Sequence, residues 1–196
     1  MQKDLEYLYS SRKYILAAVA VFTFSFAVGV LISIKYPDTS EKVLEMIKGT
    51  YGGIAVLDPF ERMLLIFKNN VFISFVALLL GIGFGIIPFA FAALNGTVLG
   101  ILVELFLKKQ GFFFVLAAIL PHGIIELPMI FISVGIGFRL GHAAYLLLTR
   151  MKTMNDLSHE LEQGIIFYIK IVAPLLLMAA FVESYLTPLI ISGFIQ

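Results

Sequence analysis

Residues 120–128 read Leu-Pro-His-Gly-Ile-Ile-Glu-Leu-Pro and place a histidine and a carboxylate four positions apart in almost entirely apolar surroundings. Prolines and a glycine fall in the same stretch, so backbone irregularity and polarity coincide. Inside a bilayer both features are costly, and they are kept where structure or function needs them. We therefore expect this stretch to be the centre of a membrane protein.

The composition supports this interpretation. Of 196 residues, 60% are hydrophobic and 14% are charged, and the mean hydropathy is +1.00. A soluble domain carries roughly 25% charged and 45–50% apolar residues. We predict an all-α, polytopic membrane helix bundle of about five spans, with broken or re-entrant helices, that crosses the lipid bilayer of the cell membrane.

Charge and cysteine content exclude several classes of function. The chain carries 14 Lys and Arg against 13 Asp and Glu, so it offers no strongly basic surface for nucleic acid. It has no cysteine, which excludes disulfides, thiolate catalysis and cysteine-ligated zinc. The first apolar run follows a charged head and lacks a small-residue cleavage site, so we expect it to remain as a membrane anchor.

We predict a single membrane domain over residues 1–196. Residues 1–13 form a polar head, residues 37–68 form an amphipathic connection at the membrane interface, and residues 69–196 form the helical core. Residues 14–34 are a clean first span. We expect a cytoplasmic N-terminus, although the Lys and Arg counts, three in residues 1–13, five in residues 35–68 and two in residues 149–163, give only a small imbalance between alternate loops.

The connection contains two helix starts. Asp38-Thr39-Ser40 offers an N-cap for a short helix that ends near Gly49, and Asp58-Pro59 begins a second helix. The apolar positions of the second helix share one face. This pattern suits a helix on the membrane surface or a lid packed on the protein's own helices.

The core is predicted to be interrupted. Asn69-Asn70 are expected to cap its first span, with a ligand contact as the alternative, and Asn95-Gly96 to form a turn. Two of its apolar pieces are too short to cross alone, which indicates re-entrant segments or one interrupted crossing. In chain order the spans and short pieces are 71–93, 97–107, 112–120, 124–148 and the region from Gly164 onward.

Polar side chains in this apolar sequence should have partners, because a charge near the bilayer centre costs at least about 2.5–3.5 kcal/mol. Glu104 and Lys108 have the i, i+4 spacing and are predicted to pair at the interface. The other polar side chains predicted to be buried are those of Asn69, Asn70, Asn95, Arg139 and His142.

His122 and Glu126 share one face of a helix that begins at or before His122. Three roles stay open for them: a hydrogen bond that fixes helix packing, half of a site for a divalent metal ion, or a proton relay or substrate contact. Glu183, where the last helix is expected to break, is the natural third metal ligand.

Glycines recur at a spacing typical of close helix contacts. Such contacts join helices within one chain or two copies in a homodimer. The pairs are Gly81-x-x-x-Gly85, Gly96-x-x-x-Gly100 and Gly137-x-x-x-Gly141.

The chain resembles the stage II sporulation protein M family of bacteria and archaea. The resemblance rests on Pro121-His122-Gly123 with Glu126-Leu127-Pro128, on Asn69-Asn70, on Asn95-Gly96 with Gly100, and on Glu183 with Thr187-Pro188. It covers roughly residues 65–190. It implies a polytopic membrane protein without an established catalytic activity; the family's namesake is a membrane scaffold that holds two peptidoglycan-degrading enzymes.

Three functions follow from these features. The leading hypothesis is a non-enzymatic membrane scaffold, a homodimer with membrane or envelope proteins as partners and a buried His/Glu polar or metal centre. The alternative is an ion- or proton-coupled transporter or channel, because discontinuous helices build such sites. A metal-dependent hydrolase is third, since no catalytic motif is present.

Overall fold

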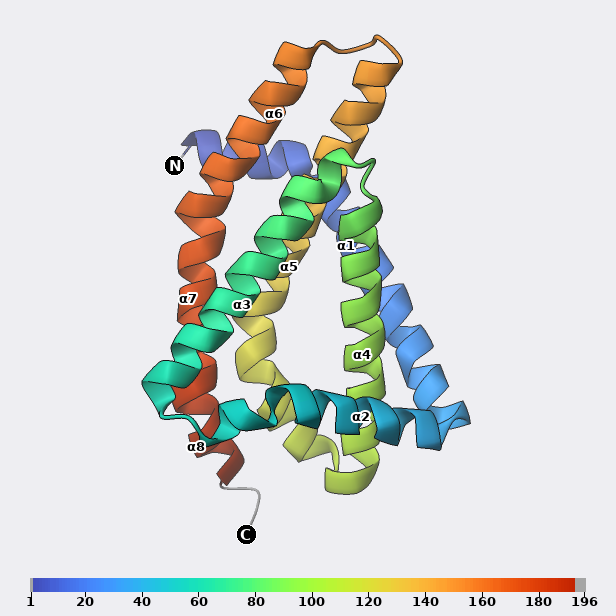
Figure 1. Cartoon of the computed structure of the whole chain (residues 1–196), viewed down its shortest axis with the longest axis vertical. Helices are drawn as coiled ribbons and strands as arrows, with labels where there is room; N and C mark the ends of the chain where they lie inside the picture. The colour runs from blue at the N-terminus through green and yellow to red at the C-terminus, as the bar shows by residue number, and fades with distance from the viewer. Residues whose placement is uncertain (1, 193–196) are drawn as a thin grey trace.

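The computed structural model describes residues 2–192, and the side chains of all of these except 51, 54, 55, 121, 122, 191 and 192. The described chain is all-α, as predicted (Figure 1). Its α-helices are α1 (Gln2–Lys35), α2 (Pro37–Tyr51), α3 (Pro59–Leu79), α4 (Ile86–Gln110), α5 (Phe112–Leu148), α6 (Met154–Phe167), α7 (Ala173–Phe181) and α8 (Thr187–Ser192). Short 3₁₀ turns η1 (Gly52–Val56) and η2 (Leu80–Ile82) and π-helical turns η3 (Tyr168–Val172) and η4 (Val182–Leu186) complete it.

Five helical segments of the described chain are long and apolar enough to cross a membrane, which confirms the predicted number of spans. They are Gln2–Lys35, Pro59–Ile82, Ile86–Gln110, Gly123–Leu148 and Met154–Ile190. An odd number of crossings places the chain ends on opposite sides, and α8 does lie at the opposite end of the bundle from the start of α1 (Figure 1). Large apolar side chains such as Phe24 and Phe72 are exposed on these helices, as lipid contact requires.

Glycines let α1 and α4 pack backbone against backbone. A Cβ on Gly29 would overlap the carbonyl of Thr97, and a Cβ on Gly100 would overlap the carbonyl of Phe26. Gly96 lies similarly close to α1. The Gly96-x-x-x-Gly100 spacing is therefore used inside the chain.

The turn between α3 and α4 packs closely against α5. A Cβ on Gly81 would overlap the backbone of Gly137, and a Cβ on Gly141 would overlap the backbone at Gly85. Gly85 adopts a φ of +76° and Phe84 a φ of +58°, so the chain reverses here through left-handed backbone. These glycine pairs also serve contacts within one chain, and their spacing gives no support to a homodimer.

The position of this turn corrects the sequence prediction. The predicted span 71–93 is wrong, because the chain turns at residues 81–85, and the predicted turn at Asn95-Gly96 lies inside α4. The Asn95 amide is satisfied within the helix, where it donates to the Phe91 carbonyl at 2.8 Å. Gly96 serves close packing instead of a turn.

The helix that begins at Asp58 extends further along the chain than predicted. Asp58 caps α3 as predicted, and its side chain accepts from the N–H groups of Phe60 at 2.9 Å and Glu61 at 3.1 Å. However, α3 continues without a break through Asn69-Asn70. Residues 59–68 are thus the first half of a span, and the two asparagines do not cap a helix.

The two apolar pieces predicted to be too short belong to longer helices. Residues 97–107 lie in α4, and residues 112–120 begin α5, which continues through Pro121-His122-Gly123. The first turns of α5 are inclined to the rest of the helix (Figure 1), and prolines are a common cause of such bends. The side chains of Pro121 and His122 lie outside the described set.

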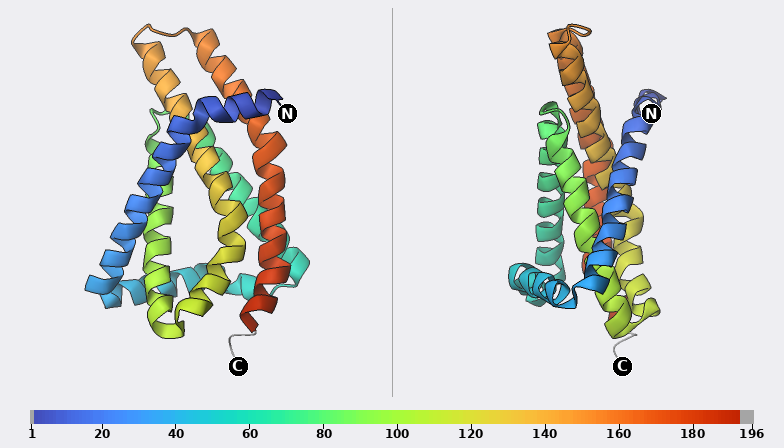
Figure 2. Two further views of the ribbon diagram at one scale, coloured as in Figure 1. Left: turned by 180° about the vertical axis from the view of Figure 1, so that it is seen from behind. Right: turned by 90° about the vertical axis from the view of Figure 1, so that its right-hand side faces the viewer.

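α2 lies across one end of the bundle (Figure 1). Its N-cap is Tyr36, which makes no side-chain capping bond, so the predicted Asp38-Thr39-Ser40 cap is wrong. The Ser40 hydroxyl instead donates to the Ser33 hydroxyl of α1 at 3.0 Å. At the other end the α5–α6 hairpin extends beyond the other helices (Figure 2).

Candidate intramembrane polar site

The carboxylate of Glu126 lies buried between helices. Glu126 is 5% exposed on α5, and the Asn70 side-chain amide of α3 donates to its Oε2 at 2.7 Å. A buried carboxylate is stable only with good donors, because it has lost its water. The contact therefore offsets part of that cost and joins two spans.

A hydroxyl pair lies one helical turn further along α3. The Ser74 hydroxyl is 2.5 Å from the Asn70 carbonyl and 2.8 Å from the Tyr168 hydroxyl. The Tyr168 hydroxyl also donates to the Val71 carbonyl at 2.8 Å. Each hydroxyl carries one proton, so two protons serve three short contacts. The group ties α3 to the last span.

Two π-helical turns interrupt the last span. Tyr168 begins η3, and Glu183 and Ser184 lie in η4. Each turn is followed closely by a proline, Pro174 or Pro188, which lacks the N–H that an α-helix needs. Wide turns of this kind are rare and frequent at functional sites. The predicted break near Glu183 takes this form.

The Ser184 side chain is buried within the described part of the chain. It is 2% exposed, and its hydroxyl oxygen has no partner there. Buried hydroxyls are normally paired, so such an atom is an exception in a folded protein. It lies next to Glu183, on a turn that packs against α3 and α5.

The predicted metal ligands are only partly placed. Glu126 lies on α5 and Glu183 on η4, and these two elements are in contact. The side chain of His122 lies outside the described set. Among the described residues, no group of three His, Asp or Glu side chains could hold a metal ion. A site formed by His122, Glu126 and Glu183 remains a prediction.

Arg139 lies at the end of the bundle where α1 begins. Its Nε is 2.7 Å from Glu160 of α6, and its Nη1 donates to the hydroxyls of Ser10 at 2.6 Å and Ser11 at 2.8 Å. Its guanidinium also lies 4.7 Å from the centre of the Tyr7 ring. This cluster fastens α1 and α6 to α5.

The remaining polar residues that were predicted to be buried differ in exposure. His142 is exposed, and its Nδ1 is 2.7 Å from the Tyr14 hydroxyl. Asn69 is also exposed, whereas Asn70 and Asn95 are half-buried. Burial was therefore predicted wrongly for Asn69 and His142.

A second buried carboxylate, that of Glu104, lies near α2, since its partner Ser33 contacts Ser40 of that helix. Glu104 is 6% exposed and pairs with Lys108 at 2.5 Å, as the i, i+4 spacing predicted. The Ser33 hydroxyl donates to it at 2.5 Å. No local pattern in the sequence points to Ser33, Ser74 or Tyr168, because each meets a partner far away along the chain.

Comparison with known proteins identifies relatives. The family model described as Stage II sporulation protein M matches residues 18–188 of the chain. An uncharacterized protein of Methanocaldococcus jannaschii is 34% identical over 128 residues, which is 63% of this chain and 69% of that protein. No solved structure matches the chain.

Proposed function

Because the chain belongs to the stage II sporulation protein M family, we propose that it is a non-enzymatic scaffold of the cell membrane that holds membrane or envelope proteins. The observation that carries this proposal is the contact of Asn70 with the buried Glu126 carboxylate. Together with the Ser74–Tyr168 contact it ties α3, α5 and the last span together. Polar groups that satisfy one another across helices favour a rigid frame.

α2 is the surface that the scaffold offers to a partner. It lies outside the spans, held by the Ser40–Ser33 contact and by Lys109, which donates to Glu41 at 2.8 Å. Its outward residues Lys42 and Glu45 are exposed. A charged face outside the bilayer suits a protein partner better than lipid.

Ion flux and cross-linking test this function. Liposomes that contain the wild type should conduct protons no faster than empty liposomes. A photo-cross-linker at Glu45 should give a discrete protein adduct in cells, whereas one at the lipid-facing Phe24 should not. A proton flux that Glu126→Ala abolishes while the protein stays folded would overturn the scaffold, as would identical cross-linking at both positions.

The second candidate is an ion- or proton-coupled transporter or channel. One observation favours it: the Ser184 hydroxyl, which has no partner among the described residues, lies beside Glu183 on a wide turn of the last apolar span. Transporters place polar groups at such interruptions. The same liposomes distinguish the candidates, because a transporter requires a flux that Ser184→Ala changes and that the exposed Ser158→Ala does not.

Orientation and assembly complete the proposal. We place the N-terminus in the cytoplasm and leave the decision to a topology reporter, because residues 1–13 carry three Lys and Arg residues and residues 35–68 carry five. A reporter protein that is active only in the cytoplasm should therefore be active when it is fused to the N-terminus. A homodimer remains a prediction, and the mass of the detergent-solubilised protein tests it, since a monomer mass would exclude it.

A further inference from the structure

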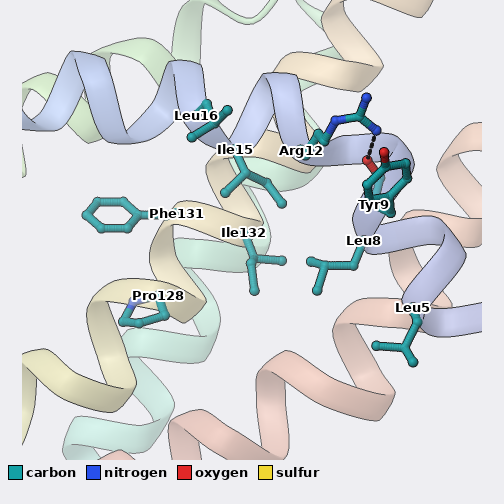
Figure 3. Close-up of a pocket in the computed structure, with 9 residues that line it drawn as sticks. All are labelled: Leu5, Leu8, Tyr9, Arg12, Ile15, Leu16, Pro128, Phe131 and Ile132. Carbon is teal, nitrogen blue, oxygen red and sulfur yellow. Dashed lines mark hydrogen bonds between the residues drawn. The ribbon is translucent and has the colours of Figure 1, made fainter.

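A groove of about 710 Å³ lies in the angle between the first turns of α1 and the middle of α5 (Figure 3). It forms because the first turns of α1 run across the bundle before the helix descends (Figure 2). Its volume lies within the roughly 300–1,000 Å³ typical of small-molecule sites. The lining includes Leu5, Leu8 and Leu16 of α1 with Phe131 and Ile132 of α5.

One charged side chain, Arg12, is present in this lining. Its guanidinium lies 3.9 Å from the centre of the Tyr9 ring, and its Nη1 donates to the Tyr9 carbonyl at 3.1 Å (Figure 3). A guanidinium has five N–H donors, so donors remain for a ligand. Stacking on the ring holds the cation at the rim before any ligand arrives.

We propose that this groove binds one anionic phospholipid, with an acyl chain between Leu16 and Phe131 and the phosphate at Arg12. Both walls belong to segments long and apolar enough to span the membrane, so the groove is open to lipid. A guanidinium matches phosphate with two parallel hydrogen bonds. Lys13, which lies 4.8 Å from the centre of the Tyr14 ring, adds a less directional attraction for a negative headgroup. This inference does not depend on the scaffold role.

Native mass spectrometry tests the headgroup contact. Protein in vesicles of equal phosphatidylglycerol and phosphatidylcholine should carry phosphatidylglycerol preferentially when it is released into the gas phase. Arg12→Gln should lower that retention at least roughly tenfold, because it removes a charge-assisted bond. Lys13→Gln is the matched control and should change retention by less than about twofold.

A second pair of variants tests the acyl-chain contact. Leu16→Trp fills the groove from α1 and should lower the retention of both lipids. Leu31→Trp should not, although Leu31 is as exposed on the same helix, 64% against 65% for Leu16. Both changes add bulk at an exposed site, so a folding defect would affect them alike.

Several results would overturn the proposal. These are equal retention of both lipids by the wild type, an equal loss in Lys13→Gln and Arg12→Gln, and unchanged retention in Leu16→Trp. Displacement of phosphatidylglycerol by inorganic phosphate alone would also overturn it, since it would identify an anion site without a chain contact.

Discussion

The side-chain amide of Asn70 donates to the carboxylate of Glu126 across the interface of α3 and α5, at 2.7 Å. Its sequence neighbour Asn69 is exposed on the surface of the same helix. Two identical residues thus have different surroundings, and the difference can be measured.

Asn70→Ala should destabilise the protein, because Glu126 stays buried and loses a donor. A hydrogen bond to a charged group contributes roughly 1.5–3 kcal/mol. Asn69→Ala should change the free energy of unfolding by no more than about 0.5 kcal/mol, as exposed substitutions usually do. Thermal unfolding in detergent measures both variants, and equal effects would contradict a buried Asn70–Glu126 contact.

Gly100→Ala should separate α1 from α4, because the new Cβ would overlap the Phe26 carbonyl. Overpacking of this kind costs typically about 1–3 kcal/mol. Gly49→Ala is the control, since a Cβ there meets nothing within 4 Å. Removing a glycine from an open helix position should stabilise by roughly 0.5–1 kcal/mol. Unfolding temperatures that fall for both variants would argue against close α1–α4 packing.

Metal analysis separates the roles left open for Glu126. A packing role, which the Asn70 contact favours, predicts that Glu126→Ala and His122→Ala lower the unfolding temperature without changing the metal content. A ligand role predicts about one metal ion per chain in the wild type and loss of it in both variants. The measurement is elemental analysis of purified protein before and after chelation, with Glu183→Ala as the third variant.

Two carboxylates at one end of the bundle should contribute unequally to stability. Glu104→Ala should cost roughly 1–3 kcal/mol, since it removes a buried partner of Ser33 and Lys108. Glu41→Ala should have no measurable effect on unfolding. The Lys109 ammonium holds the pKa of Glu41 below its ordinary value, but both side chains are exposed and solvent screens the pair.

The sign of any Glu41 contribution can be checked with pH. A lowered pKa in the folded state means that the contribution is present above the ordinary pKa and is lost as the pH falls through the folded value. Because solvent screens this exposed pair, the wild type and Glu41→Ala should have the same free energy of unfolding, within error, at neutral pH and at low pH. A stability difference that grows above pH 5 would show that the pair matters more than its exposure suggests.

Features carried by local patterns could be predicted from the sequence. Long apolar runs identified the helical class and the number of crossings, and the spacing of Glu104 and Lys108 identified their pair. Asp58 before Pro59 identified the start of α3. Each of these rests on residues close together in the chain.

Features that depend on distant partners could not be predicted. Asn95-Gly96 and the glycines of residues 81–85 are both turn signals, and only the packing of α4 against α1 decides that Gly96 stays helical. The contact of Ser74 with Tyr168 joins positions 94 residues apart, so no local spacing in the sequence predicts it. The polar centre was thus predicted in part, with Glu126 but without these hydroxyls.

The two wide turns of the last span, η3 and η4, also bear on how this segment tolerates insertions and deletions. A π-helical turn closes over one residue more than an α-helical turn, and one residue corresponds to about 100° of rotation. A chain shortened by one residue at Ile169 would regain a regular helix there, and the later side chains would keep their directions, because the wide turn had absorbed the extra residue. Relatives can therefore lose one residue within either wide turn and keep the same side chains towards α3, whereas a loss within α7 would turn all later side chains by about 100°.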